Sequence, residues 1–239
     1  EGMLFAKLLV SPMPHARVRR MDTSAAMAMP GVEAILTADD LPEAEAPQEA
    51  GLTNEPKYEG DPILAIAAVD EETAAEAIEA VQIDFEPLPF VLDPMESLRP
   101  GGPNARLDGN TMAGRDLSTI KWNNVEWNEF DNGTMPLGGE VTDEWEVGDV
   151  EAGFAEADLI LDESVFAASL SHQPLETRTA MAYWQNGKCY MHCSTQSTGR
   201  TEGNMARWVG VDPTDLVLIG EYCGGGFGGK IAASIQARI

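Results

Sequence analysis

The stretch from Gly224 to Lys230 reads Gly-Gly-Gly-Phe-Gly-Gly-Lys. It limits the possible folds and functions of the chain more than any other part of the sequence. The apolar residues 216–222 before it predict a strand, and residues 231–239 after it predict a helix. Because glycine leaves the backbone uncovered, such a loop can direct several N–H groups at an anion, and Lys230 can add positive charge. A tight turn or a close backbone crossing without a ligand is the simpler alternative.

The same loop matches two nucleotide-binding patterns, and each match is incomplete. G-x-x-x-x-G-K-[ST] fits at Gly224, Gly229 and Lys230, but Ile231 stands where a hydroxyl should hold magnesium. G-x-G-x-x-G also fits, yet its acidic ribose ligand is expected about 20 residues further on, beyond residue 239. Phe227 is also bulky for the close approach of a pyrophosphate. A nucleotide-binding protein therefore stays open only as an alternative.

The residues upstream of the loop predict a mixed domain that begins near residue 151. Asn186-Gly187 between two apolar segments is a strong hairpin signal. The expected elements are a helix over 149–157, strands over 158–166, 180–184 and 190–194, and a helix over 198–209.

The N-terminal residues predict a closed α+β domain that ends near Asp93. A helix rich in Ala and Met should end at Pro30-Gly31, and residues 42–56 read as an acidic surface loop. Residues 94–150 are richer in Gly, Asn and Pro, with scattered aromatic residues, and we expect a connector that wraps over a partner surface. The other expected elements are strands over 4–10, 18–21, 32–36, 63–69 and 81–85, a capped turn over 37–41 and a helix over 70–80.

Composition disfavours two classes of partner. The 239 residues include 40 acidic and 15 basic side chains, for a net charge of −25, which repels nucleic-acid phosphates and anionic lipid alike. The longest apolar stretches, such as residues 63–69, are far shorter than the roughly 20 residues that cross a bilayer. We therefore expect no nucleic acid as a partner and no membrane span.

The three cysteines are Cys189, Cys193 and Cys223. They form no C-x-x-C pair, and their odd number argues against a disulfide framework. A reducing compartment is the better expectation, so we predict a cytoplasmic protein. His192 lies between two of them, but the period of a strand places it on the opposite face, which disfavours a metal site there.

Three motifs in order carry a resemblance to a known family. Gly224–Lys230 is similar to the GGGFGGK loop of the molybdenum hydroxylases, the xanthine dehydrogenase and aldehyde oxidase family. Ser194-Thr195-Gln196 resembles the family's S-T-Q segment, and residues 172–176, His-Gln-Pro-Leu-Glu, resemble its H-x-P-[ML]-E segment. Further N-terminal similarities lie at residues 9–17, 30–32, 37–41 and 84–89, so the resemblance covers nearly the whole chain.

The resemblance implies the N-terminal part of a molybdopterin-binding large subunit. The implied fold is α+β, with an a/b hammerhead domain over 1–93, a connector over 94–150 and the start of a mixed α/β molybdopterin-binding domain over 151–239. The implied cofactor is molybdopterin with molybdenum, in some members as a cytosine dinucleotide. The pterin holds the metal, so no direct protein ligand is expected.

The resemblance also assigns site residues. Gln196 matches the glutamine that hydrogen-bonds an oxo ligand of molybdenum, and Gly226, Phe227 and Gly228 match the loop that passes beside the metal. No catalytic residue is expected in this chain, because the family's general-base glutamate lies beyond residue 239. Glu176 is expected to pair with Arg178 or with a backbone group instead of serving as that base.

The implied reaction is hydroxylation of an aldehyde or nitrogen heterocycle with oxygen from water, while molybdenum accepts two electrons. Ile231 stands where purine-oxidising members carry a glutamate, which disfavours a purine substrate. Cys223 precedes the loop and is expected to be a small packing residue, not a copper or sulfur ligand.

The implied partners complete the electron path. The chain has no four-cysteine cluster for iron, so a [2Fe–2S] subunit and an FAD subunit are expected. The rest of the large subunit or a companion molybdopterin chain should complete the pocket. A non-catalytic structural or assembly subunit of such a complex is the main alternative.

Overall fold

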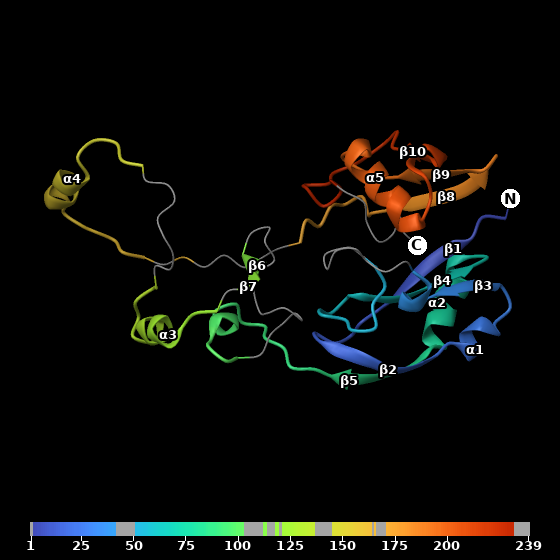
Figure 1. Cartoon of the computed structure of the whole chain (residues 1–239), viewed down its shortest axis with the longest axis horizontal. Helices are drawn as coiled ribbons and strands as arrows, with labels where there is room; N and C mark the ends of the chain where they lie inside the picture. Colours follow the sequence, from blue (N-terminus) through green and yellow to red (C-terminus); the bar gives the residue numbers. More distant parts are fainter. Residues whose placement is uncertain are drawn as a thin grey trace. The chain divides into compact units, whose positions relative to one another are not determined.

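The computed structural model of the chain describes residues 2–41, 51–102, 112–113, 118–119, 121–136, 145–163, 165 and 171–231. Contacts between residues divide the chain into two units. The first unit consists of Glu1–Pro89 and Ser171–Ile239, and the second of Phe90–Leu170. Figure 1 labels the helices and strands of both.

The N-terminal part of the first unit contains a three-stranded antiparallel sheet in the order β1-β4-β3. Its strands are β1 (Phe5–Val10), β4 (Pro62–Ala68) and β3 (Val32–Leu36). The central strand β4 is buried at every position except Ala67, as a continuous apolar run favours. The strands expected in these three places are confirmed.

Helix α2 (Glu71–Glu79) packs on this sheet. Asp70 precedes the helix, and its carboxylate accepts a hydrogen bond from Thr73 N at 2.7 Å, which satisfies one of the free N–H groups of the first turn. Ala74 and Ala77 are fully buried in the core that the helix shares with β4. Their small side chains allow close packing, and the expected helix is confirmed.

A two-stranded antiparallel sheet accompanies the first one. It pairs β2 (Ala16–Asp22) with β5 (Gln82–Pro87), so β2 is longer than the segment 18–21 that the sequence predicts. The short helix α1 (Ser24–Met27) follows β2, and the turn predicted over 37–41 contains the 3-10 helix η1 (Ala38–Asp40).

The loop predicted over 42–56 is described only at residues 51–56, and the rest lies outside the described residues. These six residues contain no helix or strand, which confirms a loop, but its expected position at the surface is wrong, because none of the six is exposed. Leu52 is buried, and the carbonyl of Asn54 accepts a hydrogen bond from Val18 N at 2.8 Å. The segment lies along β2 through backbone groups, which produce no periodic pattern of side chains.

Gly31 lies between α1 and β3, and its replacement should destabilise the fold. Its φ is +92°, and an added Cβ would lie 2.8 Å from Val69 Cγ2. We expect Gly31→Ala to lower the free energy of unfolding by about 2 kcal/mol, through backbone strain and collision together. Gly60 has a φ of +95° but nothing within 4 Å of an added Cβ. Gly60→Ala should therefore cost less in urea-induced unfolding, and equal losses would contradict the packing contribution.

The second unit gathers aromatic residues that look scattered in the sequence. The rings of Trp122, Trp127 and Phe130 lie with centroids between 5.3 and 6.1 Å apart. The Arg99 guanidinium lies 4.1 Å from the centroid of the Trp127 ring, as in a cation–π contact. The described elements are η2 (Glu96–Leu98), β6 (Met112–Ala113), β7 (Ser118–Thr119), α3 (Asn124–Asp131) and α4 (Val150–Glu156). The connector role of region 94–150 stays a prediction.

One element expected in this unit does not form. Helix α4 confirms the helix predicted over 149–157, but residues 158–163 carry no strand, so the strand predicted over 158–166 is wrong. Leu159 and Leu161 are exposed at 74% and 71%. Alternating apolar residues make a strand only when another strand pairs with them, and the described residues contain no such partner here.

The C-terminal part of the first unit contains a three-stranded sheet in the order β10-β9-β8. Strands β8 (Ala180–Gln185) and β9 (Lys188–Cys193) are antiparallel, whereas β9 and β10 (Leu216–Ile219) are parallel. The turn between the first two has φ of 53° at Asn186 and 78° at Gly187, the left-handed pair that the hairpin prediction implied.

Helix α5 (Thr198–Val209) connects the two parallel strands and confirms the predicted helix. It begins after Ser197, whose side chain accepts a hydrogen bond from Arg200 N. Met205 and Trp208 pack with buried residues of the strands in one core. The 3-10 helix η3 (Pro213–Asp215) precedes β10, which ends at Ile219 and is shorter than predicted. The helix predicted over 231–239 lies, beyond its first residue, outside the described residues.

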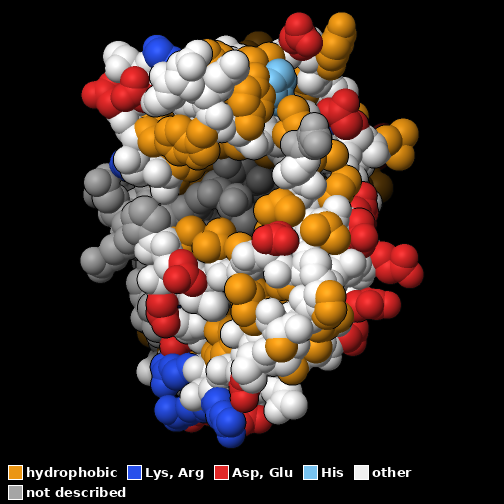
Figure 2. Space-filling view, turned by 90° about the vertical axis from the view of Figure 1, so that its right-hand side faces the viewer, with side chains coloured by type: hydrophobic (Ala, Val, Ile, Leu, Met, Phe, Trp, Pro, Cys, Tyr) orange, Lys and Arg blue, Asp and Glu red, His pale blue; other side chains and the backbone are white. Residues whose placement is uncertain are grey.

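The part of the chain that the structure describes contains no helix long and apolar enough to span a bilayer. Acidic side chains are spread over the face of the molecule in Figure 2, in keeping with the net charge of −25.

Candidate functional site

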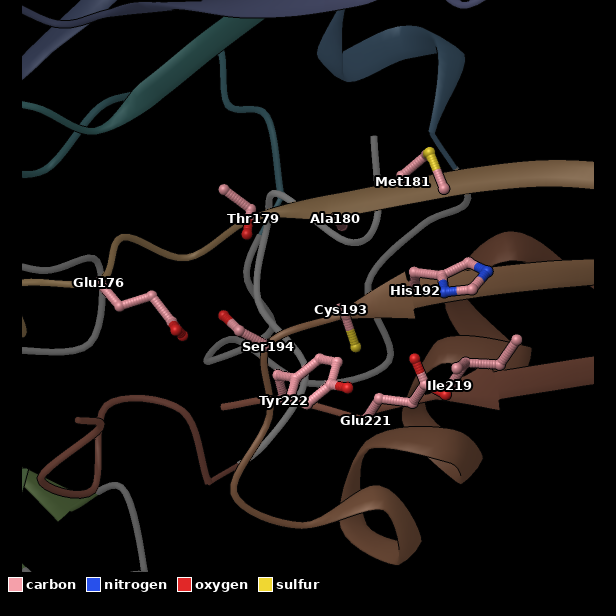
Figure 3. A pocket seen from close by; sticks show the side chains of 10 residues that line it. All are labelled: Glu176, Thr179, Ala180, Met181, His192, Cys193, Ser194, Ile219, Glu221 and Tyr222. Carbon is pink, nitrogen blue, oxygen red and sulfur yellow. The ribbon is translucent and has the colours of Figure 1, made fainter. Parts of the chain in front are cut away.

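The three motifs meet because of the strand directions. Since β8 runs antiparallel to β9, its first residue Ala180 lies opposite Cys193, the last residue of β9. Since β10 runs parallel to β9, its last residue Ile219 lies beside His192. The segment before β8 and the segments after β9 and β10 therefore share one edge of the sheet (Figure 3).

A hollow of about 360 Å³ opens at this edge. Its lining includes Glu176 before β8, Cys193 and Ser194 at the end of β9, and Glu221 and Tyr222 after β10 (Figure 3). Burial raises the pKa of the Cys193 thiol. Among the described residues, no three His, Cys, Asp or Glu side chains are grouped as a metal site.

Gln196 is bound to the glycine-rich loop through its side-chain oxygen. Oε1 accepts hydrogen bonds from Gly228 N at 3.1 Å and from Lys230 N at 3.2 Å. Because both partners are donors, the atom that faces them must be the oxygen. Its Nε2 has no hydrogen bond to any residue that the structure describes. The amide is thus held by its acceptor, and its donor is unpaired among the residues that the structure describes.

The four residues that the resemblance assigns to the cofactor lie together. Gly226 is buried against Gln196, with an ideal Cβ position that the Gln196 side chain already fills. Phe227 and Gly228 follow it in left-handed conformations, with φ of 51° and 94°. A positive φ is uncommon for phenylalanine, and it allows the loop to close with Gly229 N donating to Gly226 O at 2.7 Å. Their contact with a cofactor stays a prediction.

The middle of the loop presents free donors. The N–H groups of Gly225, Gly226 and Phe227 make no hydrogen bond to any described residue, whereas those of Gly224, Gly228, Gly229 and Lys230 all do. Consecutive unpaired N–H groups beside left-handed residues make a favourable site for an anion or an oxygen-rich group.

Steric contacts explain why the loop is so rich in glycine. An added Cβ at Gly224 would lie 2.7 Å from Glu176 Oε2, and one at Gly229 would lie 2.7 Å from an Arg178 guanidinium nitrogen. Real Cβ atoms essentially never show contacts shorter than 3.0 Å, so the side chain or the loop would have to shift. Glycine therefore suits the loop wherever a side chain from another segment approaches its backbone.

Lys230 does not supply the free charge that the sequence suggested. Its side chain is fully buried, and Nζ lies 2.5 Å from Glu176 Oε1. This hydrogen bond, together with one from Gly224 N, holds the pKa of Glu176 below its usual range. The prediction that Lys230 adds charge for an anion is wrong, because a buried ammonium requires a carboxylate partner. A nucleotide-triphosphate site, which needs that lysine at the phosphates, loses support.

Glu176 pairs differently from the expected ion pair with Arg178. Its carboxylate accepts hydrogen bonds from Lys230 Nζ and from Gly224 N, the latter at 2.8 Å. The alternative expectation, that Glu176 pairs with a backbone group, is therefore confirmed. Arg178 instead donates from Nε to Gly229 O at 2.8 Å. Sequence reasoning did not find this contact, because residues 51 positions apart leave no local pattern.

Thr195 adds a buried link that the sequence did not reveal. Its Oγ1 lies 2.8 Å from Thr201 Oγ1 and 3.2 Å from Lys230 O. Gln196 N also donates to Lys230 O at 2.8 Å. The end of the loop is thereby joined to the segment after β9 and to helix α5.

Cys223 is exposed, so its prediction as a packing residue is wrong. Since β10 ends at Ile219, position 223 falls outside the packed sheet. Its Sγ contacts Gly224 O at 3.4 Å. Ile231 at the other end of the loop is also partly exposed, at 43%.

Two family models match the chain. The model described as aldehyde oxidase and xanthine dehydrogenase, a/b hammerhead domain, matches residues 1–89. The model described as molybdopterin cofactor-binding domain matches residues 135–239. The first of these models covers the sheet β1-β4-β3, and the second covers the candidate site.

Similar proteins include the carbon monoxide dehydrogenase large chain of Afipia carboxidovorans, 30% identical over 97% of this chain and 28% of that protein. The large molybdopterin subunit of nicotinate dehydrogenase from Eubacterium barkeri is 26% identical over 99% of this chain and 51% of that subunit. The solved structure of reconstituted CO dehydrogenase from Oligotropha carboxidovorans is 27% identical, with a TM-score of 0.72 over 99% of this chain and 29% of its own.

A hammerhead domain followed by a molybdopterin cofactor-binding domain is the pair of domain types that the two family models assign to this chain. The chain belongs to the xanthine dehydrogenase and aldehyde oxidase family of molybdenum hydroxylases. It spans 28% and 29% of the length of the first two curated relatives it matches.

Proposed function

We propose that the chain forms part of the molybdenum–pterin site of an oxidoreductase that hydroxylates an aldehyde or a nitrogen heterocycle with oxygen from water. One observation carries the proposal: the Gln196 amide and the loop 224–230 are hydrogen-bonded to each other at the sheet edge. Both retain unpaired N–H donors among the described residues.

The donor set fits the proposed cofactor. The free groups are neutral N–H donors, which are suited to phosphate and oxo oxygens. Gln196 would meet an oxygen ligand, and Gly226, Phe227 and Gly228 would line the cofactor.

When bound, the molybdenum–pterin group would supply the two-electron oxidation. The residues of this chain would orient it and hold hydrogen bonds to its oxygens. No general base is proposed within residues 1–239, since the described carboxylate nearest to the loop, Glu176, is engaged by Lys230. A glutamate elsewhere in the assembly would take that role.

Ile231 supports a substrate other than a purine. It follows the loop directly, is partly exposed and offers no hydrogen-bonding group to a purine ring. An aldehyde or a less polar heterocycle is therefore proposed. Electrons would leave through [2Fe–2S] and FAD subunits, and the rest of the large subunit or a companion molybdopterin chain would close the pocket.

Elemental analysis of the complex purified from its native source tests the proposal. We expect molybdenum stoichiometric with this chain, a pterin released on denaturation, and iron in a co-purifying subunit identified by mass spectrometry. Residues 1–239 expressed alone serve as the control and should retain no molybdenum, because they span only 28% of the matched large chain. An intact complex with neither molybdenum nor pterin would favour a structural subunit or a nucleotide site.

A further inference from the structure

Glu176 connects the two ends of the glycine-rich loop. Its Oε2 accepts a hydrogen bond from Gly224 N at 2.8 Å, and its Oε1 accepts one from Lys230 Nζ at 2.5 Å. These two partners are the first and last residues of the seven-residue stretch. One carboxylate thereby closes the loop at its base.

The two halves of the loop are held unequally. The second half has several contacts outside the loop: Gln196 to Gly228 and Lys230, and Arg178 to Gly229. Among the described residues, the first half has hydrogen bonds to an outside segment only through Glu176.

The residues with free N–H groups, Gly225 to Phe227, lie between these anchors. The loop's five glycines leave its backbone free to adopt many conformations, because they carry no side chains. The direction of these N–H groups therefore depends on the hydrogen bonds that hold the two ends of the loop. Electrostatic stabilisation by such donors is sensitive to orientation, because a displacement of about 1 Å can cost about 100-fold in rate.

We propose that Glu176 is a positioning residue. Its carboxylate bridges Gly224 N and Lys230 Nζ through two hydrogen bonds, a bridge that we call the clasp. The clasp fixes the direction of the N–H groups at Gly225, Gly226 and Phe227. The inference rests on the proposed function for its effect on the cofactor, but the clasp itself is a property of this chain. Lys230 is the buried partner in this contact. Glu176 is the partner that lines the hollow (Figure 3).

The test uses the native complex with three changes to this chain. Glu176→Gln keeps the size of the side chain but removes its charge. The double variant Glu176→Leu with Lys230→Met removes the clasp without leaving a buried charge unpaired, which separates positioning from general stability. Glu202→Gln on α5 changes an exposed carboxylate of the same sheet-and-helix unit and is the matched control.

The first measurement is hydrogen exchange of the peptide that contains residues 224–230, which requires no cofactor. We expect exchange about tenfold faster in Glu176→Gln and in the double variant, and no change in Glu202→Gln. Wild-type exchange in the double variant would overturn the clasp.

The second measurement is the EPR spectrum of molybdenum together with kcat and KM. We expect a shifted spectrum and kcat lower by about 100-fold, with KM changed by less than about threefold. Faster exchange with an unchanged spectrum and unchanged kcat would overturn the positioning role. If the wild-type complex lacks molybdenum, the proposed function fails, and the exchange experiment alone still decides whether the clasp exists.

Discussion

Gly226→Ala is expected to leave the complex with little bound molybdenum or pterin and to lower kcat/KM by about 100-fold or more. The new Cβ would collide with Gln196 Oε1 and lie 2.6 Å from Gln196 Cδ. Either the loop or the glutamine must move, and the hydrogen bonds from Gly228 N and Lys230 N to Oε1 would break.

Gly225→Ala provides the matched control in the same loop. Its Cβ would meet the Phe227 ring, with a nearest distance of 3.0 Å. That exposed ring can turn aside, so the loss should be clearly smaller. Gly203→Ala on α5 adds a Cβ with nothing within 4 Å and should change neither quantity. Metal content and kcat/KM of the three variants are measured together, and wild-type metal in Gly226→Ala would contradict the contact with Gln196.

Leu64→Ala is expected to cause the largest loss of stability, about 3 kcal/mol in the free energy of unfolding. Leu64 is fully buried on the central strand β4, in the core with Ile66 and the alanines of α2. Removal of its side chain leaves a cavity. Because β4 is hydrogen-bonded to a strand on each side, it cannot move to close this cavity.

Leu92→Ala is the control for this second change, because Leu92 is 78% exposed. It should alter the free energy of unfolding by less than about 0.5 kcal/mol. Urea titration followed by circular dichroism measures both variants. Similar midpoints for the two would show that β4 is not at the centre of the core.

Local periodicity predicted most elements of the first unit. Helices α2 and α5, the apolar strand β4 and the Asn186-Gly187 hairpin follow from side-chain spacing and turn residues within a few positions. The strand expected over 158–166 failed because a strand also needs a partner, and sequence spacing does not report one. The same limitation hid the pairing of residues 51–56 with β2.

The sequence by itself revealed the glycine-rich loop and, through three motifs in order, the resemblance to the family; the cofactor role of Gln196 follows only from that resemblance and stays a prediction. Only the tertiary structure decided how these parts are joined: that Lys230 is buried against Glu176, that Arg178 reaches Gly229, and that Cys223 is exposed. The physical reason is that these contacts join segments up to 54 residues apart. Strand direction and burial select the partner of each polar group in such contacts, and neither is encoded by spacing along the chain.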